Sequence, residues 1–255
     1  MAEFFIEISL LAEFFIEISV MIDCNIRALE AGEAFSDFDR YVIGIIKRGC
    51  SSFPGKNITA RIAGGWVRDH ILGIKSDDID IIIDSVSCNQ FGEKILSFGE
   101  NFSIAHLSYN NAEGKALPIV RIGISKDTWF DITDYGEEGS PIEDARRRDF
   151  TINALFFNIT TMKVEDYFGG IDDMKNNILR TPIDPKQSCL EDPRRVLRCF
   201  RFAAMFNYTV DPALIEAIKN TRDSFDKNIS KGRIGLELQK MLDSENIIRA
   251  MDLIV

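Results

Sequence analysis

Two acidic residues spaced two positions apart, directly before an apolar run, constrain this chain more than any other feature. Asp78 and Asp80 precede the run 81–83, which consists of three isoleucines. In an extended strand, residues i and i+2 project from the same face. Two carboxylates side by side repel each other unless a cation lies between them. Mg²⁺ suits such a pair because it takes one or two carboxylates together with substrate phosphates. The spacing therefore predicts a strand over 79–84 that carries Mg²⁺.

A pair of glycines, Gly64 and Gly65, lies upstream of these acids, and Arg68 follows the pair. Glycine lets the backbone approach a phosphate closely. The helix expected over 66–72 offers its first amides to the same anion. A phosphate-binding turn ahead of a metal-binding strand is the layout of a phosphoryl-transfer site.

The alternative is a solvated acidic turn formed by Asp77, Asp78 and Asp80 in front of a strand. A bare Asp-x-Asp pattern favours that alternative. The ordered combination of the glycine pair, an Arg-Asp pair and the two acids before an isoleucine run favours the metal site.

Composition and charge restrict the classes of function. The chain has 255 residues, 45% hydrophobic and 27% charged, as in a soluble protein of one large or two small domains. The net charge of −10 argues against nucleic-acid binding over the whole surface. We expect any RNA contact to be a local basic patch or to lie on parts that are not present here. The chain has only two histidines, His70 and His106, which argues against a His-based zinc site and against a Ser-His-Asp triad.

The cysteines are scattered and form no C-x-x-C pair, which indicates a reducing compartment and argues against zinc and disulfides. We therefore expect a cytoplasmic location, with nuclear and mitochondrial pools left open. The five cysteines are Cys24, Cys50, Cys88, Cys189 and Cys199.

The N-terminus contains a near-perfect tandem repeat, because residues 2–9 and 12–19 have the same sequence. One pair of copies does not make a solenoid. The glutamates of the repeat are costly in a bilayer core, so we expect no membrane contact. The segment also lacks the features of signal and transit peptides. We interpret 1–30 as an N-terminal extension with a local duplication, and an amphipathic helix for a partner is the alternative.

Apolar periodicity predicts a small mixed sheet with helices, an α+β fold. In one expected strand, Asp131 either faces Asp78 and Asp80 or stands at the strand end, and the sequence does not decide. The expected strands are 58–63, 79–84, 103–107, 119–124, 129–132 and 155–159. The expected helices are 31–48, 66–72, 88–98, 212–220 and 232–243, and an irregular crossing covers 179–191.

Three consecutive arginines, at 146–148, are followed by Asp149. Arginine binds phosphate through paired donors, and the acid can accept a ribose hydroxyl. The run therefore predicts a nucleotide-binding cluster that includes Arg148 and Asp149. The alternative is a charged helix start held by local ion pairs.

A helix is expected to start at Pro193, because proline fits the first turn and an acid precedes it. Asp192 and Arg195 are then one turn apart, and Arg195, Arg198 and Arg201 recur every third residue. One face of the helix thus carries an acid and three guanidinium groups. Paired donors and paired acceptors are what reading a base edge requires.

These motifs, in this order, resemble the class II CCA-adding enzymes (tRNA nucleotidyltransferases), whose close relatives are the bacterial poly(A) polymerases. The resemblance runs from about residue 39 to residue 242, and the segments 179–183 and 190–193 are similar to the eukaryotic branch. The motifs are Gly64-Gly65-x-Val67-Arg68-Asp69 with Asp78-x-Asp80, Arg147-Arg148-Asp149 with Asn153-Ala154-Leu155, Asp166-Tyr167-Phe168-Gly169-Gly170, Glu191-Asp192-x-x-Arg195 with Arg198 and Arg201, and Arg233-x-x-x-Glu237.

The resemblance implies a role for each of these positions. Asp78 and Asp80 are the catalytic residues and bind Mg²⁺, while Gly65 and Arg68 hold the nucleotide phosphates. Arg148 and Asp149 are expected to bind the phosphate and the ribose of the nucleotide. Asp192 and Arg195 are expected to act as a protein template for the base, and Arg198 and Arg201 to support that template.

The resemblance also implies the domain organisation. A polymerase-β-like nucleotidyltransferase head is expected at 31–170, followed by an all-α neck with the start of a body domain at 171–255. The family continues into body and tail domains that grip tRNA, and we expect these to be absent here. A second chain that supplies them is then a candidate partner, beside the tRNA 3′ end, CTP and ATP.

The implied reaction adds C, C and A to the 3′ end of tRNA and releases pyrophosphate, without a nucleic-acid template. The first alternative is a poly(A) polymerase, or a partial enzyme that adds only CC or only A. The second is a truncated nucleotide-binding protein without transfer activity.

Overall fold

The computed structural model describes residues 2–249 except 77, 100, 111–115, 137–138, 223–224, 226–230, 243–245 and 247, and only the backbone of 2–14, 108–110, 116–117 and 233. The chain forms two compact units. The first combines Met1–Asp144 with Leu155–Tyr167, and the second combines Ala145–Ala154 with Phe168–Val255. Asp77 and the side chain of Arg233 lie outside the described residues. The expected boundaries at residues 30 and 170 stay predictions.

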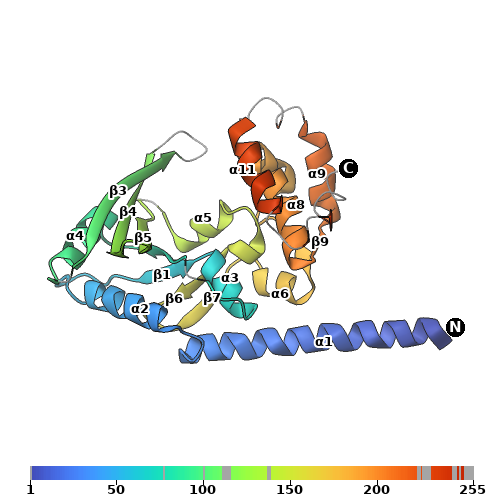
Figure 1. Ribbon diagram of the computed structural model, residues 1–255, viewed down its shortest axis with the longest axis horizontal. Coiled ribbons are helices and arrows are strands. Elements are labelled where there is room, and N and C mark those ends of the chain that lie inside the picture. Colours follow the sequence, from blue (N-terminus) through green and yellow to red (C-terminus); the bar gives the residue numbers. More distant parts are fainter. Residues whose placement is uncertain are drawn as a thin grey trace. The chain divides into compact units, whose positions relative to one another are not determined.

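A seven-stranded mixed sheet forms the first unit, which confirms the expected mixed sheet with helices (Figure 1). The strand order is β3-β4-β5-β2-β1-β6-β7. Neighbouring strands are antiparallel except β2 and β5, which are parallel. The strands are β1 (Ala60–Ala63), β2 (Asp80–Ile83), β3 (Ser103–Asn110), β4 (Ala116–Ser125), β5 (Thr128–Asp134), β6 (Leu155–Asn158) and β7 (Lys163–Asp166).

Three of the described helices of this unit lie near expected helices, whereas helices over 2–31 and 141–146 were considered only as alternatives. The helices are α1 (Ala2–Ala31), α2 (Asp37–Cys50), α3 (Gly65–Ile71), α4 (Cys88–Leu96) and α5 (Pro141–Arg146), whose last two residues belong to the second unit. The helix expected from residue 31 is wrong at its start. Gly32 has φ 75° and interrupts the helical path, and Ser36 then caps α2 in a reciprocal capping box with Asp39.

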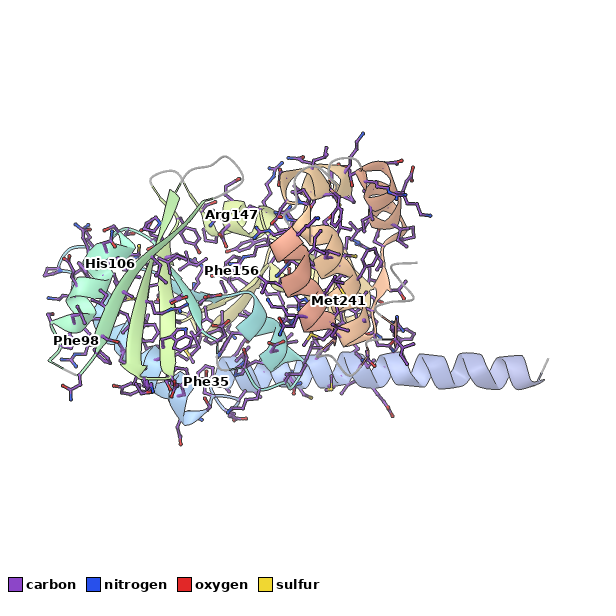
Figure 2. The ribbon with its side chains drawn as sticks, turned by 45° about the horizontal axis from the view of Figure 1, so that its top comes forward. Phe35, Phe98, His106, Arg147, Phe156 and Met241 are labelled. Atoms are coloured by element: carbon purple, nitrogen blue, oxygen red, sulfur yellow. The ribbon has the colours of Figure 1, made fainter. Side chains whose placement is uncertain are left out.

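An aromatic cluster joins α2 and α3 to the sheet. The rings of Phe35, Trp66 and Phe157 lie with centroids 5.6–6.0 Å apart (Phe35 is labelled in Figure 2). The indole Nε1 of Trp66 donates to the buried carboxylate of Asp39 at 2.8 Å. The tryptophan of the glycine-rich segment therefore anchors α3 in the core.

The C-terminal part of the N-terminal extension packs on this unit. Ile22 and Leu29 of α1 are fully buried. The Asn25 amide donates to the Ile71 carbonyl at 2.9 Å, and Glu30 pairs with Lys163 of β7 at 2.7 Å. Among the described residues, no helix is both long and apolar enough to cross a membrane.

The second unit is helical apart from two short parallel strands. A core of Leu197, Ala204 and Met241 joins its helices α8 and α11. The crossing expected to be irregular at 179–191 instead contains a strand and a helix. The elements are η1 (Thr151–Asn153), α6 (Gly170–Lys175), β8 (Ile178–Leu179), α7 (Pro185–Glu191), α8 (Arg194–Phe206), β9 (Thr209–Val210), α9 (Pro212–Asn220) and α11 (Lys231–Leu242).

Candidate active site

The glycine pair forms the turn between β1 and α3. Gly64 has φ 72° and ψ −122°, a conformation that favours glycine, and its N–H donates to the Leu155 carbonyl at 2.9 Å. A Cβ on Gly65 would lie 3.5 Å from Nη2 of Arg68. The structure therefore brings the two predicted phosphate-binding residues together.

Arg68 is itself held in place. Its guanidinium is buried and donates from Nε and Nη2 to Oδ1 of Asp69, at 2.8 and 2.7 Å. Burial raises the pKa of Asp69 above its ordinary value, and the neighbouring arginine only partly offsets this. The Arg-Asp pair of the sequence thus acts as one preformed unit beside the glycine turn.

The two predicted metal ligands lie on the exposed side of their segment. Asp78 and Asp80 are exposed, whereas Ile79 and Ile81 are 1% and 0% exposed. This alternation is that of an extended chain, so both carboxylates project to the same side. β2 pairs in parallel with β5, and the register places Asp80 beside Asp131. The register therefore decides what the sequence left open, because it puts the third acid next to the pair.

Arg121 on β4 holds the carboxylate of Asp131. The register places the two residues opposite each other, and Nε and Nη2 donate to Oδ1 and Oδ2 at 2.8 and 2.7 Å. The bond to Asp131 raises the pKa of the guanidinium, and the charges of Asp78 and Asp80 add to the effect. Arg121 thus lies in the electrostatic field of all three acids.

The residues fit a hard divalent cation. Side by side, Asp78 and Asp80 supply the carboxylate oxygens that Mg²⁺ prefers, and Asp131 is one strand away. Within the described part of the chain, no three His, Cys, Asp or Glu side chains are grouped as a ready metal site. Asp131 does not complete such a group, because its carboxylate pairs with Arg121. Two carboxylates completed by substrate phosphates match the donor set better than a closed protein cage.

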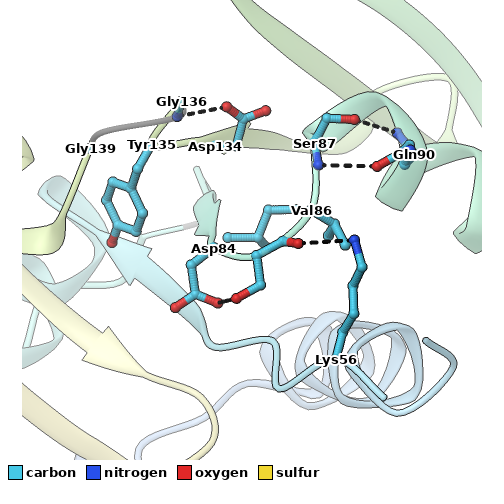
Figure 3. A pocket seen from close by; sticks show the side chains of 11 residues that line it. Lys56, Asp84, Val86, Ser87, Gln90, Asp134, Tyr135, Gly136 and Gly139 are labelled. Atoms are coloured by element: carbon cyan, nitrogen blue, oxygen red, sulfur yellow. Dashed lines mark hydrogen bonds between the residues drawn. The ribbon is translucent and has the colours of Figure 1, made fainter. Parts of the chain in front are cut away.

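A hollow of about 490 Å³ lies at the other end of β2 and β5 (Figure 3). Asp134, at the end of β5, accepts from the backbone N–H of Cys88 and Gly136, at 2.8 and 2.9 Å. Asp84 accepts from the Thr59 N–H at 2.7 Å. Asp84 also accepts from the Ser85 hydroxyl at 3.1 Å and lies 3.7 Å from Arg61, so both carboxylates are engaged within the turns that they shape.

In the second unit, Asp149 and Arg198 form a tight pair. Nε and Nη2 of Arg198 contact Oδ2 of Asp149 at 2.7 and 2.6 Å, and Asn153 donates to Oδ1 at 2.9 Å. Burial alone would raise the pKa of Asp149, but the charge of Arg198 and these hydrogen bonds lower it overall. Arg198 also approaches Glu237, which accepts from Nε of Arg201 at 2.9 Å.

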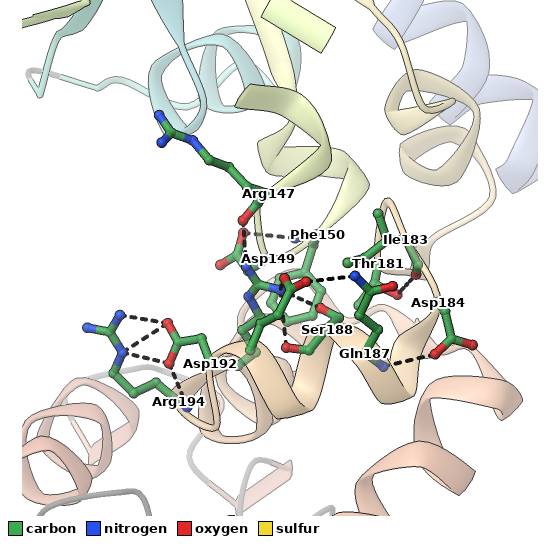
Figure 4. Close-up of polar contacts among 12 residues, drawn as sticks. Arg147, Asp149, Phe150, Thr181, Ile183, Asp184, Gln187, Ser188, Asp192 and Arg194 are labelled. Carbon is green, nitrogen blue, oxygen red and sulfur yellow. Dashed lines mark hydrogen bonds and ion pairs between the residues drawn. The ribbon is translucent and has the colours of Figure 1, made fainter. Parts of the chain in front are cut away.

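Arg195 is buried and its donors are engaged with α7 and the arginine run. Nη1 donates to the carbonyl and to Oγ of Ser188, at 3.1 and 2.8 Å, and Nη2 donates to the Arg147 carbonyl. Figure 4 shows the surrounding network, in which Arg194, not Arg195, pairs with Asp192 at 2.6 Å. Asp192 and Arg195, the two residues that the resemblance assigns to the protein template, are joined through their backbones, at 3.0 Å.

Comparison with known proteins identifies the family of this fold and site. Residues 60–180 match the poly(A) polymerase head domain. The tRNA nucleotidyltransferase cca2 of Schizosaccharomyces pombe is 34% identical over 249 residues, which cover 86% of this chain and 51% of the relative. The mitochondrial CCA tRNA nucleotidyltransferase of Saccharomyces cerevisiae is 36% identical over 221 residues, covering 77% of this chain and 40% of the relative.

The chain belongs to the tRNA nucleotidyltransferase and poly(A) polymerase family. It spans about half the length of the curated relatives that it matches. The fold of this family member is also that of the Thermotoga maritima CCA-adding enzyme complexed with tRNA. Their TM-score is 0.75 at 23% identity, over 89% of this chain and 52% of the other. The expected head-domain fold and family are thus confirmed.

Two features of this family member escaped the sequence reasoning. Arg121 and Trp129 share the exposed side of the sheet with the acids, and the Arg121 guanidinium lies 4.9 Å from the Trp129 ring centroid. The available signal was the pair of segments Val120-Arg121-Ile122 and Phe130-Asp131-Ile132, which place opposite charges between buried apolar residues.

Proposed function

We propose that this chain is a template-independent RNA nucleotidyltransferase that adds C, C and A to the 3′ end of tRNA from CTP and ATP. The observation that supports this most is the row of acids at the start of β2 and on β5. Asp78 and Asp80 share one side of an extended segment, and Asp131 is the register partner of Asp80. A glycine turn with a buried arginine begins the helix that precedes the row in the sequence.

The reaction is an in-line attack of the terminal 3′-hydroxyl of the RNA on the α-phosphate of the nucleotide. A bond forms between the 3′-oxygen and the α-phosphorus, the bond to the bridging oxygen of the β-phosphate breaks, and pyrophosphate leaves. The hydroxyl proton passes to water. When bound, Mg²⁺ lowers the pKa of the attacking hydroxyl and neutralises charge on the entering and leaving oxygens.

Asp78 and Asp80 are assigned to the metal and to the alignment of the attacking oxygen. Gly65 and Arg68 are assigned to the triphosphate, because the glycine lets a phosphate approach and the guanidinium beside it offers charged donors. The Arg68-Asp69 bonds fix that guanidinium before the nucleotide arrives, so binding orders fewer groups.

In the second unit we assign Arg148 and Asp149 to phosphate and ribose, and Asp192 and Arg195 to the base. Asp192 reads a base edge by exchanging its exposed partner Arg194 for the amino group of C or A. Arg195 supports that reading from its buried position. Arg198 and Arg201 form the ion-pair chain through Asp149 and Glu237 that keeps this helix face ordered.

A poly(A) polymerase, or an enzyme that adds only CC or only A, is the second candidate. The match of residues 60–180 to the poly(A) polymerase head domain favours it specifically. Both candidates use the same acids and the same chemistry, and they differ in which nucleotide is added and when addition stops.

Incorporation on a trimmed tRNA separates these candidates. Radiolabelled CTP alone, ATP alone and the two together are supplied to tRNA that lacks its last three nucleotides. The proposal predicts two additions from CTP, none from ATP alone and three from the mixture. Repeated addition of A identifies a poly(A) polymerase, and addition of only CC or only A from the mixture identifies a partial enzyme. CTP binding without any addition, also in low salt where phosphate contacts are strongest, identifies a protein that only binds nucleotides.

We further propose a reducing compartment, and the cytoplasm as its first choice. The five cysteines are free thiols, and burial raises the pKa of Cys50 to about 11 and that of Cys88 to about 12. Thiols of this kind are protonated near neutral pH and unreactive. The mitochondrial relative of Saccharomyces cerevisiae makes an organelle pool the alternative.

A further inference from the structure

An exposed tryptophan lies beside the acids and carries no role in the site described above. The Trp129 side chain is 39% exposed on the open side of β5, whereas the next residue, Phe130, is 1% exposed. Trp129 and Asp131 are two positions apart on one strand, so they project to the same side at a spacing of about 7 Å. The ring therefore projects to the same side as Asp131, the register partner of Asp80.

Trp129 also lines a hollow that contains one of the metal-binding acids. The hollow has a volume of about 790 Å³, and its walls are Phe38, Asp78, Asp127, Thr128 and Trp129. The Arg121 guanidinium lies over the indole, 4.9 Å from the ring centroid, while it holds Asp131. The guanidinium thereby contacts one face of the ring.

We propose that Trp129 is the stacking platform for the base of the 3′-terminal nucleotide of the RNA primer. Aromatic side chains stack on unpaired bases of any sequence, and such platforms adjoin the path of a single strand. A base on Trp129 brings its own ribose, with the attacking 3′-hydroxyl, toward Asp78 and Asp80. Trp129 is thus a positioning residue for the proposed reaction, and the inference rests on that proposed function.

The walls favour the primer over the incoming nucleotide. Asp127 lines the hollow beside Trp129 and is not assigned to the metal, so its negative charge disfavours the triphosphate of CTP or ATP there. The terminal nucleoside of an RNA carries a neutral 3′-hydroxyl and a single phosphodiester. Its base also brings amino donors when it is C or A, which carboxylates accept. The phosphates of the incoming nucleotide are instead assigned to the glycine turn and Arg68.

Tryptophan fluorescence measures this contact without any transfer. The chain has two tryptophans, and Trp66 is only 1% exposed, so quenching by a bound base reports on Trp129. The full chain is titrated, in Mg²⁺ without nucleotides, with a single-stranded RNA and with the same RNA whose last nucleotide lacks its base. The proposal predicts quenching by the first RNA and about tenfold weaker binding of the second, which corresponds to about 1.4 kcal/mol.

Variants then assign the effect to the ring. Trp129→Ala is expected to weaken binding of the complete RNA about tenfold and to leave binding of the base-free RNA and the KM for CTP unchanged. Trp129→Phe keeps a stacking surface and is expected to stay within about twofold of the wild type. The control Tyr41→Ala removes an aromatic side chain of similar exposure, 42%, on α2 and is expected to behave as wild type.

Equal affinity of the wild-type chain for the two RNAs overturns the proposal, and so does quenching by CTP without quenching by RNA. Because the two RNAs are compared on the wild-type chain, poor folding of Trp129→Ala does not remove the test. Quenching that depends on the base, without nucleotide incorporation, would refute the proposed transferase activity and still support the Trp129 contact. Nucleotide incorporation together with RNA binding that does not depend on the base would refute the Trp129 contact and leave the proposed transferase activity supported.

Discussion

Replacing Arg195 by alanine is expected to destabilise the second unit strongly, although the same residue was predicted from the sequence as a base-reading group. Its guanidinium is buried and donates to both oxygens of Ser188 and to the Arg147 carbonyl. Ser188 is fully buried. The substitution removes this donor from Oγ of Ser188 and from the Arg147 carbonyl, whereas the Ser188 carbonyl still accepts from the Asp192 N–H at 3.3 Å.

The magnitude follows from these contacts. A hydrogen bond from a charged donor contributes about 1.5–3 kcal/mol, and a buried acceptor without a partner costs about 1–3 kcal/mol. The contributions are not additive, and water can enter the space of the lost side chain, so we expect a loss of about 3 kcal/mol in the free energy of unfolding. For a chain of this length, that loss lowers Tm by roughly 6–12 °C.

Arg194 provides a matched control, because it is the neighbouring arginine at the start of α8. Its side chain is 47% exposed and pairs with Asp192 at 2.6 Å. Exposed ion pairs contribute about 0–1 kcal/mol, so Arg194→Ala is expected to shift Tm by no more than about 3 °C. Thermal unfolding followed by circular dichroism at 222 nm measures both variants. A Tm of Arg195→Ala within 2 °C of that of Arg194→Ala would refute the structural role.

Three further predictions concern the candidate site. Asp80→Asn should lower CTP incorporation at least about 10³-fold with Tm unchanged, because the side chain is exposed; retained incorporation removes Asp80 from the metal site. Gly65→Ala should keep Tm within about 3 °C, since the added Cβ meets only Nη2 of Arg68 at 3.5 Å, and should weaken CTP binding about tenfold in a calorimetric titration; unchanged affinity would mean that no phosphate approaches this glycine. The lowered pKa of Asp149 contributes stability that is present above the unfolded pKa of about 3.9 and is lost as pH falls through the folded pKa. The urea midpoint should therefore drop more between pH 6 and pH 3 in the wild type than in Asp149→Asn, and equal drops would contradict the assignment.

Several elements could be predicted from the sequence because their signals are local. The isoleucine run after Asp80 and the glycine pair before α3 predicted a strand and a turn, and both form. Burial alternation along one strand needs no knowledge of its neighbours, so the shared side of Asp78 and Asp80 followed from spacing alone. The helix 212–220 was predicted with its observed bounds, since Asp211 caps it and Pro212 opens it.

Two helix boundaries carry local sequence signals that the prediction from periodicity did not use. α7 begins with Asp184 as its N-cap and Pro185 in its first turn, the same pattern that marked 212–220. Only seven residues long, the helix shows too few apolar positions for its period to stand out. Gly32 and the Ser36 capping box likewise separate α1 from α2 inside a stretch that reads as continuous helix.

The sequence by itself determined the family, the mixed sheet and the shared side of Asp78 and Asp80, because these depend on the order and spacing of residues near one another in the chain. Only the tertiary structure decided that Asp131 lies beside Asp80, that Arg121 holds it, and that Arg194 rather than Arg195 pairs with Asp192. Strand register and the choice among several possible ionic partners depend on which segments pack together, and the spacing of residues along the chain does not determine that packing.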